Sequence, residues 1–163
     1  MNETSFQEQL TRILTAQVQL SGDLLALLQQ EYEILCTAKL DNLENLVEQK
    51  KPIMVDLENL GCAWELLLKN RNVELSMEGI SQFLNKFDHE HNTELLSAWT
   101  TLLEKTRLCK EKNTVNGTVI NIRNQATQQV LALLRGQKPE DRMYNHHGCE
   151  SSLSTGGKSL AKA

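Results

Sequence analysis

Apolar residues recur every three or four positions along two long stretches of this chain, and this spacing constrains the fold more than any other feature. The first stretch comprises Leu43, Leu46, Ile53, Leu57, Leu60, Trp64 and Leu67. The second comprises Leu95, Trp99, Leu102, Thr106, Cys109, Asn113, Asn116, Ile120, Arg123, Thr127, Val130 and Leu134. Lys50 is the one polar residue at the expected steps of the first stretch. Such spacing places side chains on one face of a helix, which packs against another helix.

The composition favours packed helices over sheets. Hydrophobic residues make up 40% of the 163 residues and aromatic residues only 4%, so the core must be built mainly from leucine. This balance suits long helices better than a sandwich or a barrel. The length fits one domain. The formal net charge of −4 argues against nucleic acid as a partner, because phosphate binding needs a clustered basic surface.

We therefore predict an all-α fold, an elongated antiparallel bundle or coiled coil of three long helices plus a short connecting helix. The helices are expected over residues 4–38, 41–69, 77–87 and 93–134, with a polar turn over residues 88–93. Residues 1–136 would form the helical domain. Residues 137–163 are rich in glycine and serine. They bury too little apolar surface to offset chain entropy, so they are predicted to form a flexible tail.

Two residues interrupt the helical pattern. Gly22 costs about 1 kcal/mol in a helix interior relative to alanine, and we expect the first helix to continue through it, with a kink as the alternative. Pro52 costs about 3 kcal/mol, because it removes a hydrogen bond to Glu48 and clashes with that residue. The apolar spacing keeps its phase across Pro52. A bent second helix is therefore favoured, with a break at Lys51 as the alternative.

The sequence also contains signals for helix ends. Asp41 and Glu44 have the spacing of a capping box at the start of the second helix. Ser76 is placed to cap the short helix, and Arg135-Gly136 is typical of a helix end. We expect the short helix to turn four apolar side chains inward: Ile80, Phe83, Leu84 and Phe87.

The cysteines and histidines do not predict a metal or redox site. Cys36, Cys62 and Cys109 are expected to be small buried core residues, and no CxxC pair occurs. The remaining candidates are interpreted as solvated loop residues, because neither cluster alone supplies the three or four ligands of zinc: His89 and His91, and His146, His147 and Cys149. A bundle metalloenzyme is also disfavoured, since neither His89 nor His91 follows a glutamate by three residues.

No other motif indicates catalysis or a cofactor. Gly157-Lys158-Ser159 resembles the end of a phosphate-binding loop, but Ser152 stands where that motif needs its first glycine. No serine lies in a nucleophile-elbow pattern. We therefore predict a protein that is not an enzyme and needs no cofactor.

The first residues and the apolar runs bear on location. Residues 1–10 contain two glutamates and no basic residue, unlike a secretory signal. The apolar runs are too short to cross a bilayer. The expectation is a cytoplasmic protein without stable membrane insertion.

Asn113 and Asn116 occupy positions of the apolar spacing where leucine would be expected. One interpretation is a polar layer inside the bundle, where an amide fixes register at a cost in stability. The alternative is a face left partly open for another protein. The same face is unusually polar over residues 113–127, which predicts loose packing there.

Several of these residues, in this order, resemble the FlgN family of bacterial flagellar export chaperones. The first half of the resemblance rests on Leu24, Leu27, Leu28, Glu31, Leu35, Leu43, Leu46, Lys50 and Leu57. The second half rests on Leu102, Leu103, Asn113-Thr-Val-Asn116-Gly117, Ile120, Val130-Leu-Ala-Leu-Leu134-Arg-Gly136 and the segment 144–148. The resemblance covers residues 10–148, and it departs from the family pattern at Pro52 and His146-His147-Cys149.

The resemblance implies a role in binding. Members of this family bind the helical termini of flagellar hook-associated (hook–filament junction) proteins and bring them to the flagellar type III export gate. By the same resemblance, the partner-binding residues would be Asn113, Asn116, Ile120, Val130, Leu131 and Leu134. The resemblance also implies that Tyr144 contacts the export gate. Packing of the same leucines inside the bundle is the alternative, because apolar faces usually pack internally.

A second hypothesis for the whole protein is a structural coiled-coil adaptor or tether without an export function. It shares the helices but predicts a constitutive oligomer, which sedimentation of the free protein would detect. Self-association of the chain is left open by the sequence.

Overall fold

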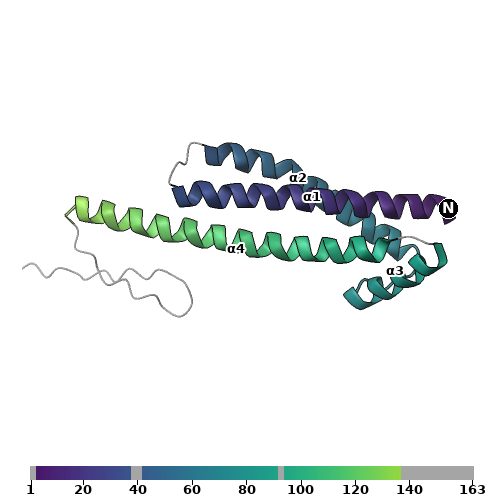
Figure 1. Ribbon diagram of the computed structural model, residues 1–163. Coiled ribbons are helices and arrows are strands. Elements are labelled where there is room, and N and C mark those ends of the chain that lie inside the picture. The colour runs from purple at the N-terminus through teal and green to yellow at the C-terminus, as the bar shows by residue number, and fades with distance from the viewer. Residues whose placement is uncertain (1–2, 38–41, 92–93, 137–163) are drawn as a thin grey trace, which may run out of the picture. The chain divides into compact units, whose positions relative to one another are not determined.

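The computed structural model describes residues 3–37, 42–91 and 94–136, and these ranges contain four helices and no strand (Figure 1). The helices are α1 (Glu3–Thr37), α2 (Leu43–Lys69), α3 (Met77–His91) and α4 (Leu95–Leu134). The chain divides into two units, residues 1–122 and residues 123–163. The predicted all-α bundle of three long helices and one short helix is confirmed. The predicted tail, residues 137–163, lies outside the described residues.

Polar contacts between the helices give their directions. Glu3 at the start of α1 pairs with Arg71 just beyond the end of α2, whereas Glu31 near the end of α1 pairs with Lys50 in α2. The start of α1 therefore lies near the end of α2, and the later part of α1 lies near the earlier part of α2, so the two helices are antiparallel. Lys105 of α4 reaches Val18 and Asn116 of α4 reaches Leu28, so α4 runs in the same direction as α1. Successive long helices therefore alternate in direction.

The largest apolar core joins the first half of α1 to the end of α2, to α3 and to the start of α4. Its fully or nearly buried members are Phe6, Leu10, Leu14, Trp64, Leu67, Leu68, Ile80, Leu84, Phe87, Leu95, Trp99 and Leu102. Phe6 meets Phe87 edge-on, with 5.7 Å between ring centroids, and Trp64 stacks on Trp99 at the same separation. The aromatic residues are few, but they concentrate where four helices meet.

α1 and α2 both continue through the residues that disfavour a helix. α1 is unbroken at Gly22, as predicted, and the absent side chain there has a structural use. A Cβ built on Gly22 would lie 2.8 Å from Lys105 Nζ, and this ammonium group donates a hydrogen bond to the carbonyl oxygen of Val18 at 3.0 Å. Glycine therefore leaves room for the Lys105 ammonium group to reach the α1 backbone.

α2 is likewise unbroken at Pro52, so the alternative of a break at Lys51 is wrong. Pro52 lies on the exposed side of the helix. On that side, water can satisfy the carbonyl group that loses its helical hydrogen bond.

Two predicted boundaries need correction around residues 88–93. α3 continues to His91, so residues 88–91 are helical and His89 and His91 are not loop residues. The ring of His91 packs on Phe87, with 4.3 Å between ring centroids, and α3 is one turn longer than predicted. The Asp88 carboxylate accepts hydrogen bonds from the backbone N–H groups of Leu95 and Leu96, at 3.0 and 2.8 Å. It thereby caps the next helix.

The other end signals can be compared with the structure directly. The N–H of Gly79 donates to Ser76 Oγ at 3.0 Å, which confirms the predicted cap of α3. Gly136 adopts a left-handed φ of 68° and its N–H donates to the Leu133 carbonyl, which confirms the end of α4. Asn42 occupies the N-cap of α2 without a side-chain hydrogen bond. Asp41, the predicted cap, lies outside the described residues.

The cysteine prediction is right at one position and wrong at two. Cys109 is buried, and its thiol donates to the Ser21 carbonyl oxygen at 3.4 Å. Burial raises the pKa of the Cys109 thiol. Cys36 and Cys62 are exposed, because they lie on the outer faces of α1 and α2, away from the buried positions Leu35 and Trp64.

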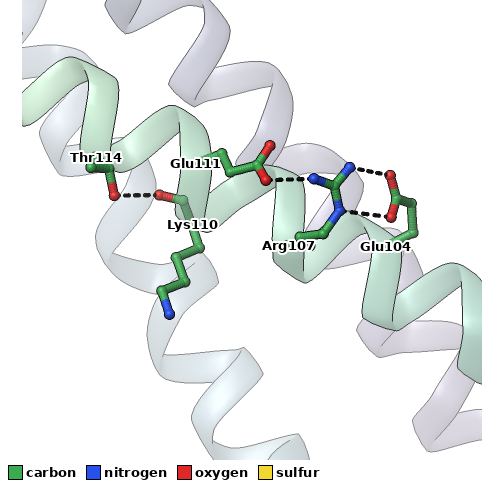
Figure 2. Close-up of polar contacts among 5 residues, drawn as sticks. All are labelled: Glu104, Arg107, Lys110, Glu111 and Thr114. Atoms are coloured by element: carbon green, nitrogen blue, oxygen red, sulfur yellow. Dashed lines mark hydrogen bonds and ion pairs between the residues drawn. The ribbon is translucent and has the colours of Figure 1, made fainter.

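The exposed face of α4 carries a chain of charges in the middle of the helix. Figure 2 shows Arg107 between Glu104 and Glu111, hydrogen-bonded to both carboxylates, and Thr114 donating to the Lys110 carbonyl oxygen. The hydrogen bonds from Arg107 lower the pKa of Glu104, and the same contact raises the pKa of Arg107. These contacts support the helix at neutral pH, and the share from Glu104 is lost as the pH falls through its lowered pKa.

Replacement of Gly22 tests its contact with the Lys105 ammonium group. Gly22→Ala should leave the free energy of unfolding nearly unchanged, because a gain of about 1 kcal/mol in helix propensity is offset by the loss of the hydrogen bond from Lys105, worth about 1 kcal/mol. Gly61→Ala is the matched control, since nothing lies within 4 Å of its added Cβ. It should stabilise by about 1 kcal/mol. Urea unfolding followed by circular dichroism measures both.

The same prediction has a second arm. In a Lys105→Ala background, Gly22→Ala should stabilise by about 1 kcal/mol, as at Gly61, because the obstacle is gone. If Gly22→Ala stabilised the unaltered chain as much as Gly61→Ala does, the contact with Lys105 would not explain this glycine.

Candidate partner-binding site

Three polar side chains from three helices meet inside the bundle, and we call Glu31, Lys50 and Asn116 the polar node. Lys50 Nζ lies 2.6 Å from Glu31 Oε1. Asn116 Nδ2 donates to Glu31 Oε2 at 2.8 Å and to the Leu28 carbonyl oxygen at 2.9 Å. Each carboxylate oxygen of Glu31 therefore has its own donor, one from α2 and one from α4.

Burial makes the pairing within the polar node necessary. The side chain of Glu31 is 6% exposed and that of Lys50 is 14% exposed. An unpaired charge at such a depth would cost several kcal/mol. Only one arrangement of the three helices brings these groups together, so the node fixes their register. Asn116 Oδ1 is buried without a hydrogen-bond partner in the described part of the chain, so the node is not fully satisfied.

The polar node was partly visible in the sequence. Lys50 and Asn116 stood out because each replaced an apolar residue, and for Asn116 the interpretation as a polar layer in the bundle is confirmed. Asn113 is exposed and takes no part in the node. Glu31 was missed as their common partner. Its signal was its position between Leu28 and Leu35, where the spacing of α1 also calls for an apolar residue.

α4 is attached to α1 by a series of side-chain to backbone hydrogen bonds. Three residues of α4 donate to carbonyl oxygens of α1, and the pairs are Lys105 with Val18, Cys109 with Ser21, and Asn116 with Leu28. Asn116 is the last buried residue of α4 in the described chain. Over residues 117–122, side chains are at most partly buried, and Ile122 is 60% exposed. The tight α1–α4 interface thus ends at the polar node.

The unit that begins at residue 123 is described as far as Gly136, and its helical part is apolar at its end. Leu134 is 79% exposed. The exposed apolar residues of this segment are Val130, Leu131, Leu133 and Leu134, which we call the α4 end patch. Single exposed apolar residues are ordinary, whereas several close together are the more informative observation.

The structure separates the six predicted partner-binding residues into three groups. Val130, Leu131 and Leu134 are exposed. Ile120 is half-buried, and Asn113 is exposed in the unit that ends at residue 122. Asn116 is 1% exposed and bonded within the polar node, so it can act on a partner only through the position of α4.

One residue of the α4 end patch was not predicted, and several predicted residues lie outside the described part of the chain. Leu133 was not among the predicted residues, although the unbroken apolar run 130–134 was a signal for it. Tyr144 and the segment His146-His147-Cys149 lie outside the described residues, as does Gly157-Lys158-Ser159. Among residues 3–37, 42–91 and 94–136, no group of three or more histidine, cysteine or acidic side chains could hold a metal ion.

Comparison with known proteins agrees with the resemblance read from the sequence. A family model described as FlgN protein matches residues 1–152. The chain belongs to the FlgN family. A crystal structure described as a flagella synthesis protein FlgN from Pseudomonas aeruginosa is similar to this chain, with 28% identity and a TM-score of 0.62. The match covers 77% of this chain and 95% of that one. No curated protein matches the chain.

Membership of this family gives the chain a flagellum-related chaperone role. The helices in the described residues include none that is both long enough and apolar enough to span a membrane.

Substitutions in the polar node should be strongly non-additive. Lys50→Met should lower the free energy of unfolding by about 3 kcal/mol, because it leaves the Glu31 carboxylate buried without its cation. The triple variant Glu31→Leu/Lys50→Met/Asn116→Leu should recover most of that loss, since no buried polar group remains unpaired. Lys51→Met is the matched control, because its pair with Glu48 is exposed, and its cost should be under about 1 kcal/mol.

Urea denaturation of the four proteins measures these differences. Equal costs for Lys50→Met and Lys51→Met would contradict a node that depends on burial. A triple variant that is less stable than Lys50→Met alone would contradict the argument from unpaired groups.

Proposed function

We propose that this chain is a cytoplasmic export chaperone for flagellar hook-associated (hook–filament junction) proteins. It binds their helical termini, prevents premature assembly and delivers them to the flagellar type III export apparatus. The observation that carries the proposal is the α4 end patch, which leaves four large apolar side chains exposed at a helix end. Family membership supports the flagellar context.

The chemistry of the patch suits an amphipathic helix as the partner. A subunit that polymerises through its terminal helices exposes apolar faces that aggregate if left uncovered. A chaperone helix covers such a face by helix-to-helix pairing, with side chains at steps of three and four residues as anchors. Val130, Leu131 and Leu134 lie at such steps. Their small number keeps the complex reversible, as delivery requires.

The remaining predicted residues receive different roles in this proposal. Val130, Leu131 and Leu134 contact the partner helix, and Leu133 joins them. Ile120 and Asn113 contribute at the upstream side. Asn116 is a positioning residue, because its hydrogen bonds to Leu28 and Glu31 hold α4 on the bundle. No step of this function involves a chemical reaction by the chain, and none needs a cofactor.

The proposal assigns Tyr144 to the contact with the export gate. This assignment rests on the family resemblance of segment 144–148. A separate contact for the gate lets one chaperone hold its cargo and dock at the same time.

Charged substitutions in the α4 end patch should abolish capture without unfolding the bundle. Val130→Asp/Leu134→Asp should weaken binding to purified hook-associated proteins by at least about tenfold, because buried apolar anchors dominate such interfaces. Met77→Asp is the matched control, an exposed apolar residue on α3 whose replacement should leave binding unchanged. Isothermal titration calorimetry measures the affinity, and circular dichroism checks the fold. Unchanged affinity of the double variant for every hook-associated protein would refute the proposed surface.

Replacement of Tyr144 should separate delivery from capture. Tyr144→Ala should reduce secretion of hook-associated proteins and assembly of filaments, while calorimetry gives nearly unchanged affinity for the cargo. An equal loss of secretion and cargo binding would argue against a separate docking role.

A further inference from the structure

Arg123 is a cation of α4 that the described part of the chain leaves unpaired. Its side chain is half-buried, and the guanidinium nitrogen Nη1 is buried without a hydrogen-bond partner among the described residues. A donor that has lost water without gaining an acceptor costs free energy. The free chain therefore holds a guanidinium group whose strongest possible interaction, with a carboxylate, is not made.

The neighbours of Arg123 along the helix explain why it is unpaired. Arg107, earlier in α4, is hydrogen-bonded to Glu104, three residues before it, and to Glu111, four residues after it (Figure 2). The residues at the same steps from Arg123 carry no carboxylate, and they are Val119, Ile120, Ala126 and Thr127. In a chain with 21 acidic residues, positions 112–139 contain none. The helix thus offers Arg123 no intrahelical ion pair.

Arg123 is aligned with apolar residues that the proposed function assigns to the partner. Val130 follows it by seven residues and Leu134 by eleven. At about 100° per residue, both steps return to within about 20° of the direction of Arg123. Arg135 follows it by twelve residues and lies about 120° away around the helix. One face of α4 therefore presents a cation about two turns before its exposed apolar side chains.

We propose that Arg123 binds a carboxylate of the cargo helix and so selects cargo segments that carry an aspartate or glutamate in line with their apolar face. This inference rests on the proposed function, because the same cargo helix packs on Val130 and Leu134. The carboxylate lies about two to three turns along the cargo helix from the side chains that contact these two residues. A guanidinium group can hold it through two parallel hydrogen bonds.

The charge of this part of α4 supports an acidic partner. Arg123 and Arg135 are the charged residues of positions 113–136, whereas the whole chain has a formal net charge of −4. An acidic cargo helix therefore meets no repulsion along this stretch. Two cations that lie on different sides of a helix are not the clustered basic surface that a nucleic acid needs. The exposed Val130 and Leu134 favour a protein helix instead.

Replacement of Arg123 by methionine separates the charge contact from apolar packing. Methionine keeps an unbranched apolar stem, so without a facing carboxylate it should leave cargo affinity unchanged or raise it. The inference predicts the opposite. Isothermal titration calorimetry with purified hook-associated proteins should show a loss of about tenfold or more, because the cargo carboxylate loses its partner.

Arg135→Met is the matched control for this experiment. It removes the same charge from the same stretch of α4, off the face of Arg123, and should change cargo affinity by less than about twofold. The fold is checked by urea unfolding of the free chain. The midpoint should not fall in Arg123→Met, because the buried N–H group has no partner to lose in the described chain.

A charge exchange identifies the carboxylate on the cargo. Arg123→Glu should weaken binding more than Arg123→Met does, because it sets two carboxylates against each other. Each aspartate and glutamate in the terminal helices of the hook-associated protein is then replaced by lysine. One of these variants should recover at least about tenfold in affinity for the Arg123→Glu chain. Recovery at no position would overturn the inference.

The remaining outcomes distinguish this inference from the proposed function. A chain that binds no hook-associated protein, or binds it equally well after Val130→Asp/Leu134→Asp, overturns both. Binding that depends on Val130 and Leu134 but is unchanged or stronger in Arg123→Met overturns the inference alone. A loss in Glu140→Gln/Asp141→Asn equal to that in Arg123→Met also overturns it, because the carboxylate would then belong to this chain.

Discussion

The buried Glu31–Lys50–Asn116 contact is the constraint on which the arrangement of the three long helices depends. Leucine faces can slide past one another in steps of a helical turn with little change in buried area. A carboxylate with one donor from α2 and another from α4 cannot, because each slip leaves a charge buried and unpaired. The aromatic core at the other end supplies most of the apolar burial, and the node supplies the register.

Much of this fold could be predicted, because spacing in the sequence reports directly on which side of a helix is buried. The helices, the Ser76 cap and the end at Gly136 follow from local rules. What escaped prediction depends on contacts between distant residues. Asp88 lies inside α3 but caps α4, whose first residue follows seven positions later. Gly22 matters because its missing side chain leaves room for the Lys105 ammonium group. No single-helix rule contains either fact.

In the candidate site too, residues that follow a local pattern could be predicted, and contacts between distant residues could not. Val130, Leu131 and Leu134 could be selected from an apolar run whose exposure the structure then establishes. Asn116 could be recognised as an anomaly, but its partner could not, because Glu31 and Asn116 are separated by 85 positions in the chain. Cys36 and Cys62 were misplaced because average burial of cysteine says nothing about helix phase, and both lie off the buried face.

The division of α4 gives the polar node a bearing on function. Up to Asn116, the helix is held by donors to the α1 backbone, and these bonds leave little freedom to repack. In the segment from residue 123, the large apolar side chains are exposed. A buried amide at the last tight contact is a physical boundary between the scaffold and the proposed binding segment. Replacing it with leucine would favour further packing of the free chain at the expense of the surface that a partner helix needs.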